Sequence, residues 1–308
     1  MNRFITVAQV VAPIFAAVVL GIITRKGKGM TREQISGLQQ FVMKYGLPCV
    51  LFNSCYTARI SAESVSTMAM VLPLVLFSAF WAFRARKKFG CHNFPMLFSA
   101  QESGMLGIPL YLILFGADQV YRMGVLDLTQ SVVAIPVIAL LSSDTEENAS
   151  LGEIVKKVFS SPFLLMSLLG LGLNLSGAAA WLEDSGFGTV ITESTGFLAQ
   201  PVSALMLFSV GYNFSLSKGN RKTIFRIAAI HFGMFALYCV LIQSVLFLVP
   251  NVDNLTRWAV LLYCALPASY LAPSLGRSEE DYTVASGVCS ILTVACLVVF
   301  CFIVAVAV

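Results

Sequence analysis

The stretch Gly107-Ile108-Pro109 interrupts a long apolar run in the first half of the chain, and Leu266-Pro267-Ala268-Ser269 interrupts another in the second half. Each run is otherwise typical of a membrane-spanning helix, which must satisfy its own backbone groups because the hydrocarbon core offers no water. Proline removes a backbone donor and clashes with the preceding turn, at a cost of about 3 kcal/mol or more. Breaks at matching places in two halves therefore indicate a feature that the fold needs.

Composition places the chain in the membrane class. Of its 308 residues, 57% are hydrophobic and only 12% are charged, whereas a soluble domain carries roughly 25% charged residues. Apolar stretches of about 20 residues are long enough to span a bilayer. We count ten of them, at about 5–24, 35–56, 65–83, 94–115, 120–141, 162–175, 190–212, 224–249, 255–275 and 282–308. The predicted fold class is an all-α polytopic membrane protein with ten transmembrane helices.

The basic residues test this count, because cytoplasmic loops are enriched in Lys and Arg. With the N-terminus outside, fifteen of the 20 basic residues fall on the inner side and four on the outer side, while Lys44 stays within a span. An error of one helix would move Lys218–Arg226 to the wrong side. We therefore predict a multi-pass protein of the cell (inner) membrane, with both termini on the extracytoplasmic side.

The ten spans divide into two similar halves. A first five-helix repeat covers residues 1–141, a short cytoplasmic linker covers 142–161, and a second five-helix repeat covers 162–308. Prolines near the middle of the second and seventh spans, Pro48 and Pro201, match as the two breaks do. Since each repeat holds an odd number of spans, we predict a 5+5 inverted repeat with broken crossover helices four and nine. Such repeats are typical of secondary transporters, whose substrate sites lie between the halves.

Four short motifs follow one another along the chain. They are LPCVLF at Leu47–Phe52, ESGMLGIPL at Glu102–Leu110, LPASYLAP at Leu266–Pro273 and ASGV at Ala285–Val288. In this order they resemble the auxin efflux carrier (PIN-like) family, within the bile/arsenite/riboflavin transporter group. The short linker makes the chain similar to compact bacterial-type members rather than to the plant hormone exporters with their large loop.

The resemblance implies a scaffold of spans 1, 2, 6 and 7 and a transport bundle of spans 3, 4, 5, 8, 9 and 10. It also implies that the partners are the lipid bilayer and a small organic anion, such as a dicarboxylate or an indole acid, and not nucleic acid. One residue departs from the family pattern, because Glu102 stands where an asparagine is usual. A carboxylate there would repel an anion unless it is protonated or paired with a cation.

The two breaks define the predicted substrate site. Pro109 and Pro267 can each stand in the first turn of a half-helix, where a missing donor costs little. The N–H groups of such a turn attract negative charge, and small or hydroxyl residues allow close approach and hydrogen bonding. The predicted substrate-binding residues are Glu102, Ser103, Gly104, Gly107, Pro109, Gln130, Pro267 and Ser269.

Ionisable residues inside a bilayer are costly and usually face a cavity. Glu102 is the hypothesised residue for proton or cation coupling, because burial favours the neutral form of a carboxyl group. Asp127 lies one turn from Gln130 on the same helix face, and it either joins the coupling site or lies at a solvated mouth. Lys44 either snorkels to the membrane edge or acts as a counter-ion to the substrate or Glu102, which we favour.

No cofactor is expected beyond a coupling H+ or Na+, since the sequence has no metal-ligand spacing, nucleotide loop or catalytic constellation. We therefore expect no enzyme, but a secondary active transporter of small organic anions that works by alternating access at the crossover of spans four and nine. A sodium-coupled bile-acid-type symporter is one alternative. An intramembrane enzyme or sensor is a second, from another class. Whether the chain acts alone or as a homodimer stays open.

Overall fold

The structure is a computed structural model that describes residues 3–57, 62–142, 162–214, 221–248 and 252–307. Nearly all of these residues are helical, which confirms the predicted all-α class. Within the described ranges, β pairing is limited to one isolated antiparallel bridge between Gln101 and Ala268. The predicted cytoplasmic linker lies, from residue 143 onward, outside the described residues.

The first half contains a series of helices that include two π-helical turns, η1 and η2, and one 3-10 turn, η3. In chain order they are α1 (Arg3–Lys26), α2 (Arg32–Phe41), η1 (Val42–Gly46), α3 (Leu47–Thr57), α4 (Ala62–Phe89), α5 (Met96–Ser99), η2 (Ser103–Gly107), α6 (Ile108–Phe115), η3 (Ala117–Gln119) and α7 (Tyr121–Ser142).

The second half has the same character, with one 3-10 turn, η4. Its elements are α9 (Pro162–Leu175), α10 (Ala178–Asp184), α11 (Phe187–Ala199), α12 (Val202–Asn213), α13 (Arg221–Leu248), α14 (Asn254–Ala265), η4 (Ala272–Leu275) and α15 (Glu279–Ala307).

Several of these helices can cross a bilayer. Five are long and apolar enough to do so, and a sixth candidate is a pair of helices bent by 80°. The five are Val7–Lys26, Ser66–Phe89, Phe187–Asn213, Arg221–Leu248 and Glu279–Ala307, and the bent pair is Leu165–Leu175 with Ala178–Asp184. The chain is thus a membrane protein with several candidate spans. The count of ten and the inverted repeat stay predictions, because a broken span cannot qualify as one long helix.

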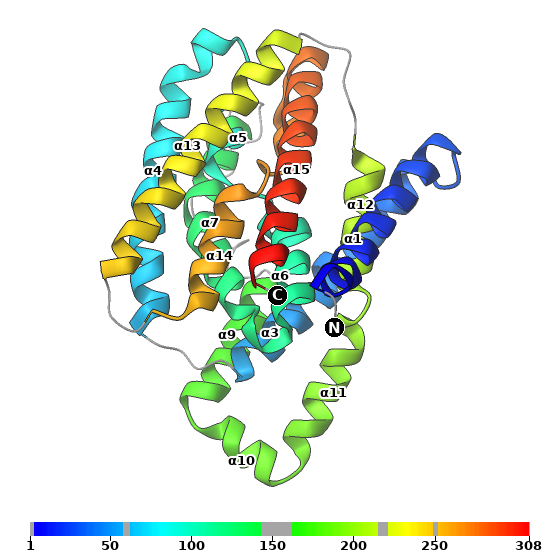
Figure 1. The fold of residues 1–308 in the computed structure, drawn as a ribbon, viewed down its shortest axis with the longest axis vertical. Helices are drawn as coiled ribbons and strands as arrows, with labels where there is room; N and C mark the ends of the chain where they lie inside the picture. The colour runs from blue at the N-terminus through cyan, green and yellow to red at the C-terminus, as the bar shows by residue number, and fades with distance from the viewer. Residues whose placement is uncertain (1–2, 58–61, 143–161, 215–220, 249–251, 308) are drawn as a thin grey trace.

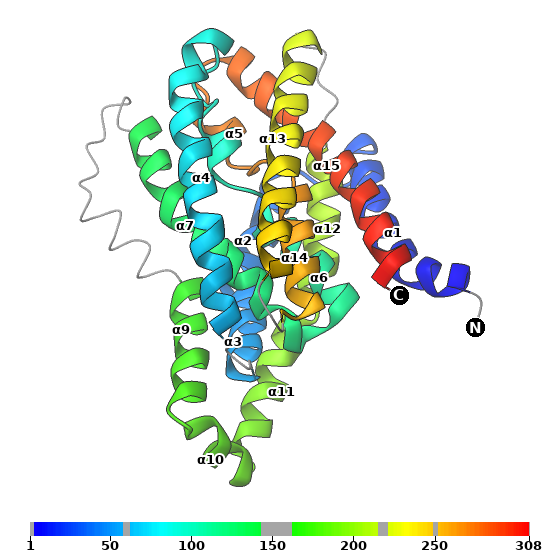
Figure 2. The ribbon, with the colours of Figure 1, turned by 60° about the vertical axis from the view of Figure 1, so that its left-hand side comes forward.

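The helices form a body from which one end projects. α4, α13 and α15 stand side by side around the short elements α5 and α14, and α1 runs along α12 (Figures 1 and 2). α3 packs along α9, and the α9–α10–α11 segment extends beyond the rest at the lower end of Figure 1. The two breaks lie inside this body, since Gln101 and Ala268 are 2% and 0% exposed.

The contact between α1 and α12 depends on two glycines. A Cβ atom at Gly211 would lie 1.9 Å from the carbonyl oxygen of Val18, and one at Gly21 would lie 2.1 Å from the carbonyl oxygen of Phe208. Small residues let helix backbones approach in this way where lipid provides no hydrophobic force between helices. A methyl group at either position would force the two helices apart.

We predict that Gly211→Ala lowers the free energy of unfolding by about 1–3 kcal/mol, the usual cost of overpacking a close contact. Gly172→Ala in α9 is the matched control, because no heavy atom lies within 4 Å of its added Cβ. Thermal unfolding in detergent measures both variants. Equal melting temperatures for the two would contradict the close contact.

Candidate functional site

The first of the two broken spans is interrupted at residues 100–102 rather than at residues 107–109, where the helix Ser103–Phe115 continues through a π-turn. This break pairs through its backbone with the second break, at residues 267–269. The N–H of Glu102 donates to the carbonyl of Pro267 at 2.8 Å, and the N–H of Ser269 donates to the carbonyl of Ala100 at 3.0 Å. These two bonds flank the antiparallel bridge of the fold. Each break thereby satisfies backbone groups that an interrupted helix leaves free, as a membrane interior requires.

The Glu102 carboxylate connects both segments. Its Oε1 accepts the N–H of Met105 at 3.3 Å, which caps η2, and its Oε2 accepts the N–H of Tyr270 at 2.6 Å. Only 8% of Glu102 is exposed. We expected free N–H groups at this point to receive the carboxylate of a substrate. In the structure they bind the carboxylate of Glu102 instead.

The two prolines take different positions. Pro109 is the second residue of α6, but η2 leads into α6 without interruption, so Pro109 lies inside one helix, Ser103–Phe115. The expectation that Pro109 begins a half-helix was wrong, because this helix begins at Ser103, after the non-helical residues 100–102. Pro267 lies in an extended segment and begins no helix, so the same expectation was wrong for Pro267. The residue before a proline favours extended backbone, and Leu266 has φ −61° and ψ 150°. Pro273 instead occupies the first turn of η4.

Gln130 joins α7 to the crossover. Its Oε1 accepts the N–H of Gln101 at 2.7 Å and the hydroxyl of Tyr263 at 3.0 Å. Its Nε2 donates to the carbonyl of Gln101 and to the Oγ of Ser103, both at 2.8 Å. The Gln130 amide therefore binds both the N–H and the carbonyl of Gln101 in the first break. It also orients the hydroxyl of Ser103.

Asp127 lies with this group. Its Oδ1 accepts a short hydrogen bond from the hydroxyl of Ser103 and a bond of 2.9 Å from Nε2 of Gln130. The side chain is partly buried. Of the two interpretations that the sequence left open, the structure agrees with a position at the crossover.

The remaining predicted residues differ in their contributions. A Cβ at Gly107 would lie 2.7 Å from a methyl carbon of Leu266, so the two segments approach closely there. Gly104 has more room, since the nearest atom would be 3.9 Å away. Ser269 is buried and accepts the N–H of Leu271 at 3.3 Å, within its own turn. Lys44 is exposed in η1, and within the described residues it forms no ion pair with Glu102.

Sequence reasoning missed two residues of the site. His231 on α13 is 1% exposed, and its Nε2 lies 3.1 Å from Oε1 of Gln101. The rings of Phe98 and Phe235 lie 5.4 and 4.6 Å from the imidazole. A single histidine on an apolar helix more often packs than binds, and neither its sequence context nor that of Gln101 indicates such a contact.

A cavity of about 190 Å³ adjoins the crossover, between α12 and α15. Tyr270 belongs to both places, because its N–H binds Glu102 while its ring lines the cavity and its hydroxyl lies 2.7 Å from Oγ1 of Thr293. The polar lining residues are Asn213, Tyr270, Tyr282, Ser286, Ser290 and Thr293. Hydroxyl and amide groups therefore dominate the polar part of the wall.

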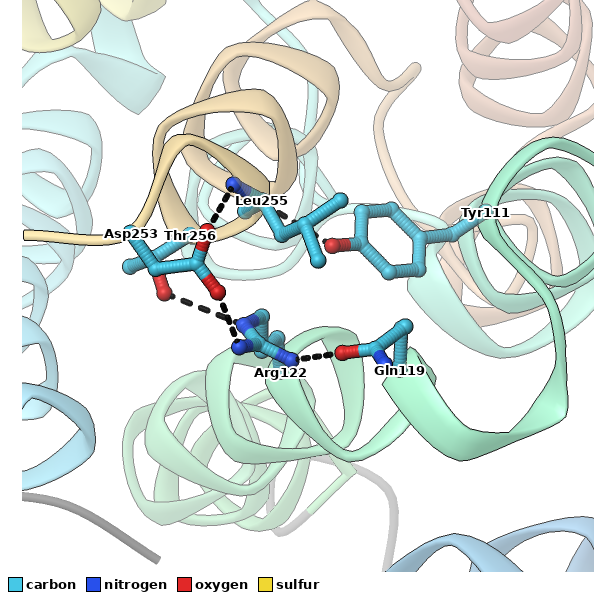
Figure 3. Close-up of polar contacts among 6 residues, drawn as sticks. All are labelled: Tyr111, Gln119, Arg122, Asp253, Leu255 and Thr256. Carbon is cyan, nitrogen blue, oxygen red and sulfur yellow. Dashed lines mark hydrogen bonds and ion pairs between the residues drawn. The ribbon is translucent and has the colours of Figure 1, made fainter. Parts of the chain in front are cut away.

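A second polar cluster lies at the starts of α7 and α14 (Figure 3). The Arg122 guanidinium pairs with Asp253 at 2.5 Å, donates to Oγ1 of Thr256 at 3.2 Å and reaches Gln119. Asp253 also caps α14 through the N–H of Leu255 at 3.0 Å. The Arg122 cluster thus fastens the first half of the chain to the start of the second broken span.

No protein-family model matches the chain. The chain is similar to an uncharacterized transporter of Methanothermobacter thermautotrophicus, with 24% identity over 215 residues. The matched region covers 68% of this chain and 68% of that protein. The assignment to the auxin efflux carrier family stays a prediction.

We predict that Arg122→Gln lowers the free energy of unfolding by about 1–2 kcal/mol, between the values for exposed and buried ion pairs. The reason is that the Arg122 side chain is 11% exposed and that of Asp253 is 40% exposed. A double-mutant cycle with Asp253→Asn should give a coupling energy of at least about 0.5 kcal/mol. Asp118→Asn, at an exposed carboxylate in η3, is the control. A coupling energy of zero would contradict the pairing.

Proposed function

We propose that this chain is a secondary active transporter of small organic anions that works by alternating access, with its substrate site beside the crossover. The observation that carries this proposal is the antiparallel pairing of two helix breaks, at residues 100–102 and 267–269, from opposite halves of a membrane protein. Broken spans that meet inside a membrane are tolerated where they are buried or line a cavity, and they mark the sites of secondary transporters. The similarity to a protein named as a transporter agrees with this proposal.

Two contacts support an inverted repeat. Near the start of the predicted fourth span, Asn93 donates to the backbone carbonyl of Asp281, near the start of the tenth span, at 3.4 Å. At the start of the ninth span, Asp253 pairs with Arg122, at the start of the fifth span. An inverted repeat relates spans four and ten to spans nine and five. The contact between spans four and ten is therefore equivalent in position to the contact between spans nine and five. The first is a hydrogen bond to a backbone carbonyl and the second is an ion pair.

The cavity beside Tyr270 suits a small substrate. Its volume of about 190 Å³ is below the range of roughly 300–1,000 Å³ that drug-sized ligands need. Asn213 and Tyr282 belong to ends of α12 and α15 that adjoin predicted cytoplasmic loops. We infer a substrate the size of a dicarboxylate, entering from the cytoplasmic side in this conformation. Both chain termini then face the opposite side of the cell membrane.

Several groups around the cavity favour an anion. Serine and tyrosine hydroxyls and the Asn213 amide can donate hydrogen bonds to carboxylate oxygens. Arg25 stands behind the wall, where its guanidinium donates to the carbonyls of Phe214 at 2.8 Å and Tyr212 at 3.4 Å. Arg25 can therefore attract an anion to the cavity without forming a direct ion pair with it. A direct ion pair would hold the anion too tightly for release.

Counterflow in proteoliposomes tests the function. Vesicles loaded with unlabelled malonate, malate or succinate should take up the same labelled compound against its gradient, in a saturable way. Bile acids should exchange poorly, because their four-ring skeleton exceeds the cavity. Protein-free vesicles are the control. Linear, non-saturable uptake of every compound would indicate a pore and contradict the proposal.

Filling the cavity should block transport without unfolding the protein. We predict that Ser286→Leu, at a lining residue of α15, reduces dicarboxylate counterflow at least tenfold, since the larger side chain occupies substrate space. Val294→Leu on the same helix is the control, because that side chain is 49% exposed at the outer surface. Equal counterflow by Ser286→Leu and the wild type would show that the substrate binds elsewhere.

A further inference from the structure

We propose that Glu102 is a proton-binding site and that the ion coupled to transport is H+ rather than Na+. The proton site rests on the geometry of the crossover, whereas its coupling to transport rests on the proposed function. The argument depends on which groups surround the two oxygens of the carboxylate and on which charges face it.

Backbone donors occupy both oxygens. The N–H of Met105, from the first half of the chain, points at Oε1, and the N–H of Tyr270, from the second half, points at Oε2. A hard cation such as Na+ is bound by several converging oxygen atoms. In the hydrogen bonds described for Glu102, both partners of the carboxylate are instead N–H donors, and neither is an oxygen that could join it in such a cage.

The neighbouring carboxylate has a similar environment. Asp127 accepts hydrogen bonds from the Ser103 hydroxyl and from the Gln130 amide nitrogen. The oxygen of that amide is already taken by Gln101 and Tyr263. In these contacts the groups around Asp127 thus act as hydrogen-bond donors toward it.

The charges that face Glu102 leave its neutralisation to a proton. α7 presents Asp127, the second break presents Tyr270, and α15 presents Cys289. On α13, His231 contacts the adjacent Gln101. Within the described residues, neither Lys nor Arg forms an ion pair with Glu102. A buried carboxylate without a cationic partner is costly, and a proton removes that cost without needing a ligand cage.

Protonation has a direct structural effect. An ionised carboxylate accepts strong, charge-assisted hydrogen bonds from both segments. A proton from water bound at one oxygen converts that oxygen into a donor, which weakens the bond to the N–H that faces it. Each proton taken up on one side of the membrane therefore loosens the link between the halves, and its release to the other side restores the link.

The proton site is tested on purified protein in nanodiscs without substrate. Infrared difference spectra recorded as the pH falls should show a protonated-carboxyl band that Glu102→Gln loses, that Glu102→Asp shifts and that Glu280→Gln retains. Glu280 is an exposed carboxylate on α15. The same band in Glu102→Gln would overturn the proposal. So would a rise in melting temperature with NaCl, relative to choline chloride, that Glu102→Gln abolishes.

Coupling is tested separately in proteoliposomes. For one proton per substrate, a gradient of one pH unit should drive about tenfold accumulation, and an equal sodium gradient should drive none. In Glu102→Gln the final accumulation ratio should fall to one, whatever the rate. Sodium-driven accumulation would overturn the coupling. If no carboxylate exchanges at all, the proposed function fails, while the infrared test still decides the proton site.

Discussion

Every backbone N–H and C=O group in the hydrocarbon core must find a partner within the protein, and the two helix breaks, at residues 100–102 and 267–269, meet that requirement by pairing with each other. Glu102 and Ser269 donate their N–H groups across the crossing, and Pro267 and Ala100 accept them. The nearby polar groups serve the same need. Gln130 on α7 binds both backbone groups of Gln101. The unpaired backbone of the first break thereby fixes the position of α7 as well.

Glu102 changes how such a crossover can work. N–H groups that start helical turns attract anions, and here an anion belonging to the chain already fills the place. A substrate carboxylate then has to bind nearby, where the cavity offers hydroxyls and an amide. Tyr270 connects the two positions through its backbone and its ring. Substrate binding in the cavity and the charge of Glu102 can therefore influence each other through Tyr270.

The sequence predicted the helical class, the second break and the gathering of Glu102, Ser103 and Gln130, because buried polar residues are costly in a membrane. It placed the first break at residues 107–109, whereas the helix continues there through a π-turn and is interrupted at residues 100–102. It did not predict that Pro267 lies in an extended segment, since a proline is compatible with either a helix start or an extended strand. The contact of His231 with Gln101 and the cavity wall on α12 depend on how helices pack. Packing brings together residues that carry no local pattern. For the same reason Lys44 was expected inward and lies at the surface.

The pairing of the breaks also bears on how the protein is made. Glu102 and Tyr270 are 168 residues apart in the chain. At a synthesis rate of about 5–20 residues per second, the first break waits roughly 10–30 seconds for its partner segment. During that interval its backbone groups have no partner from the second half, so the insertion machinery or trapped water must supply their hydrogen-bond partners. The fold is therefore completed only when the last third of the chain enters the membrane.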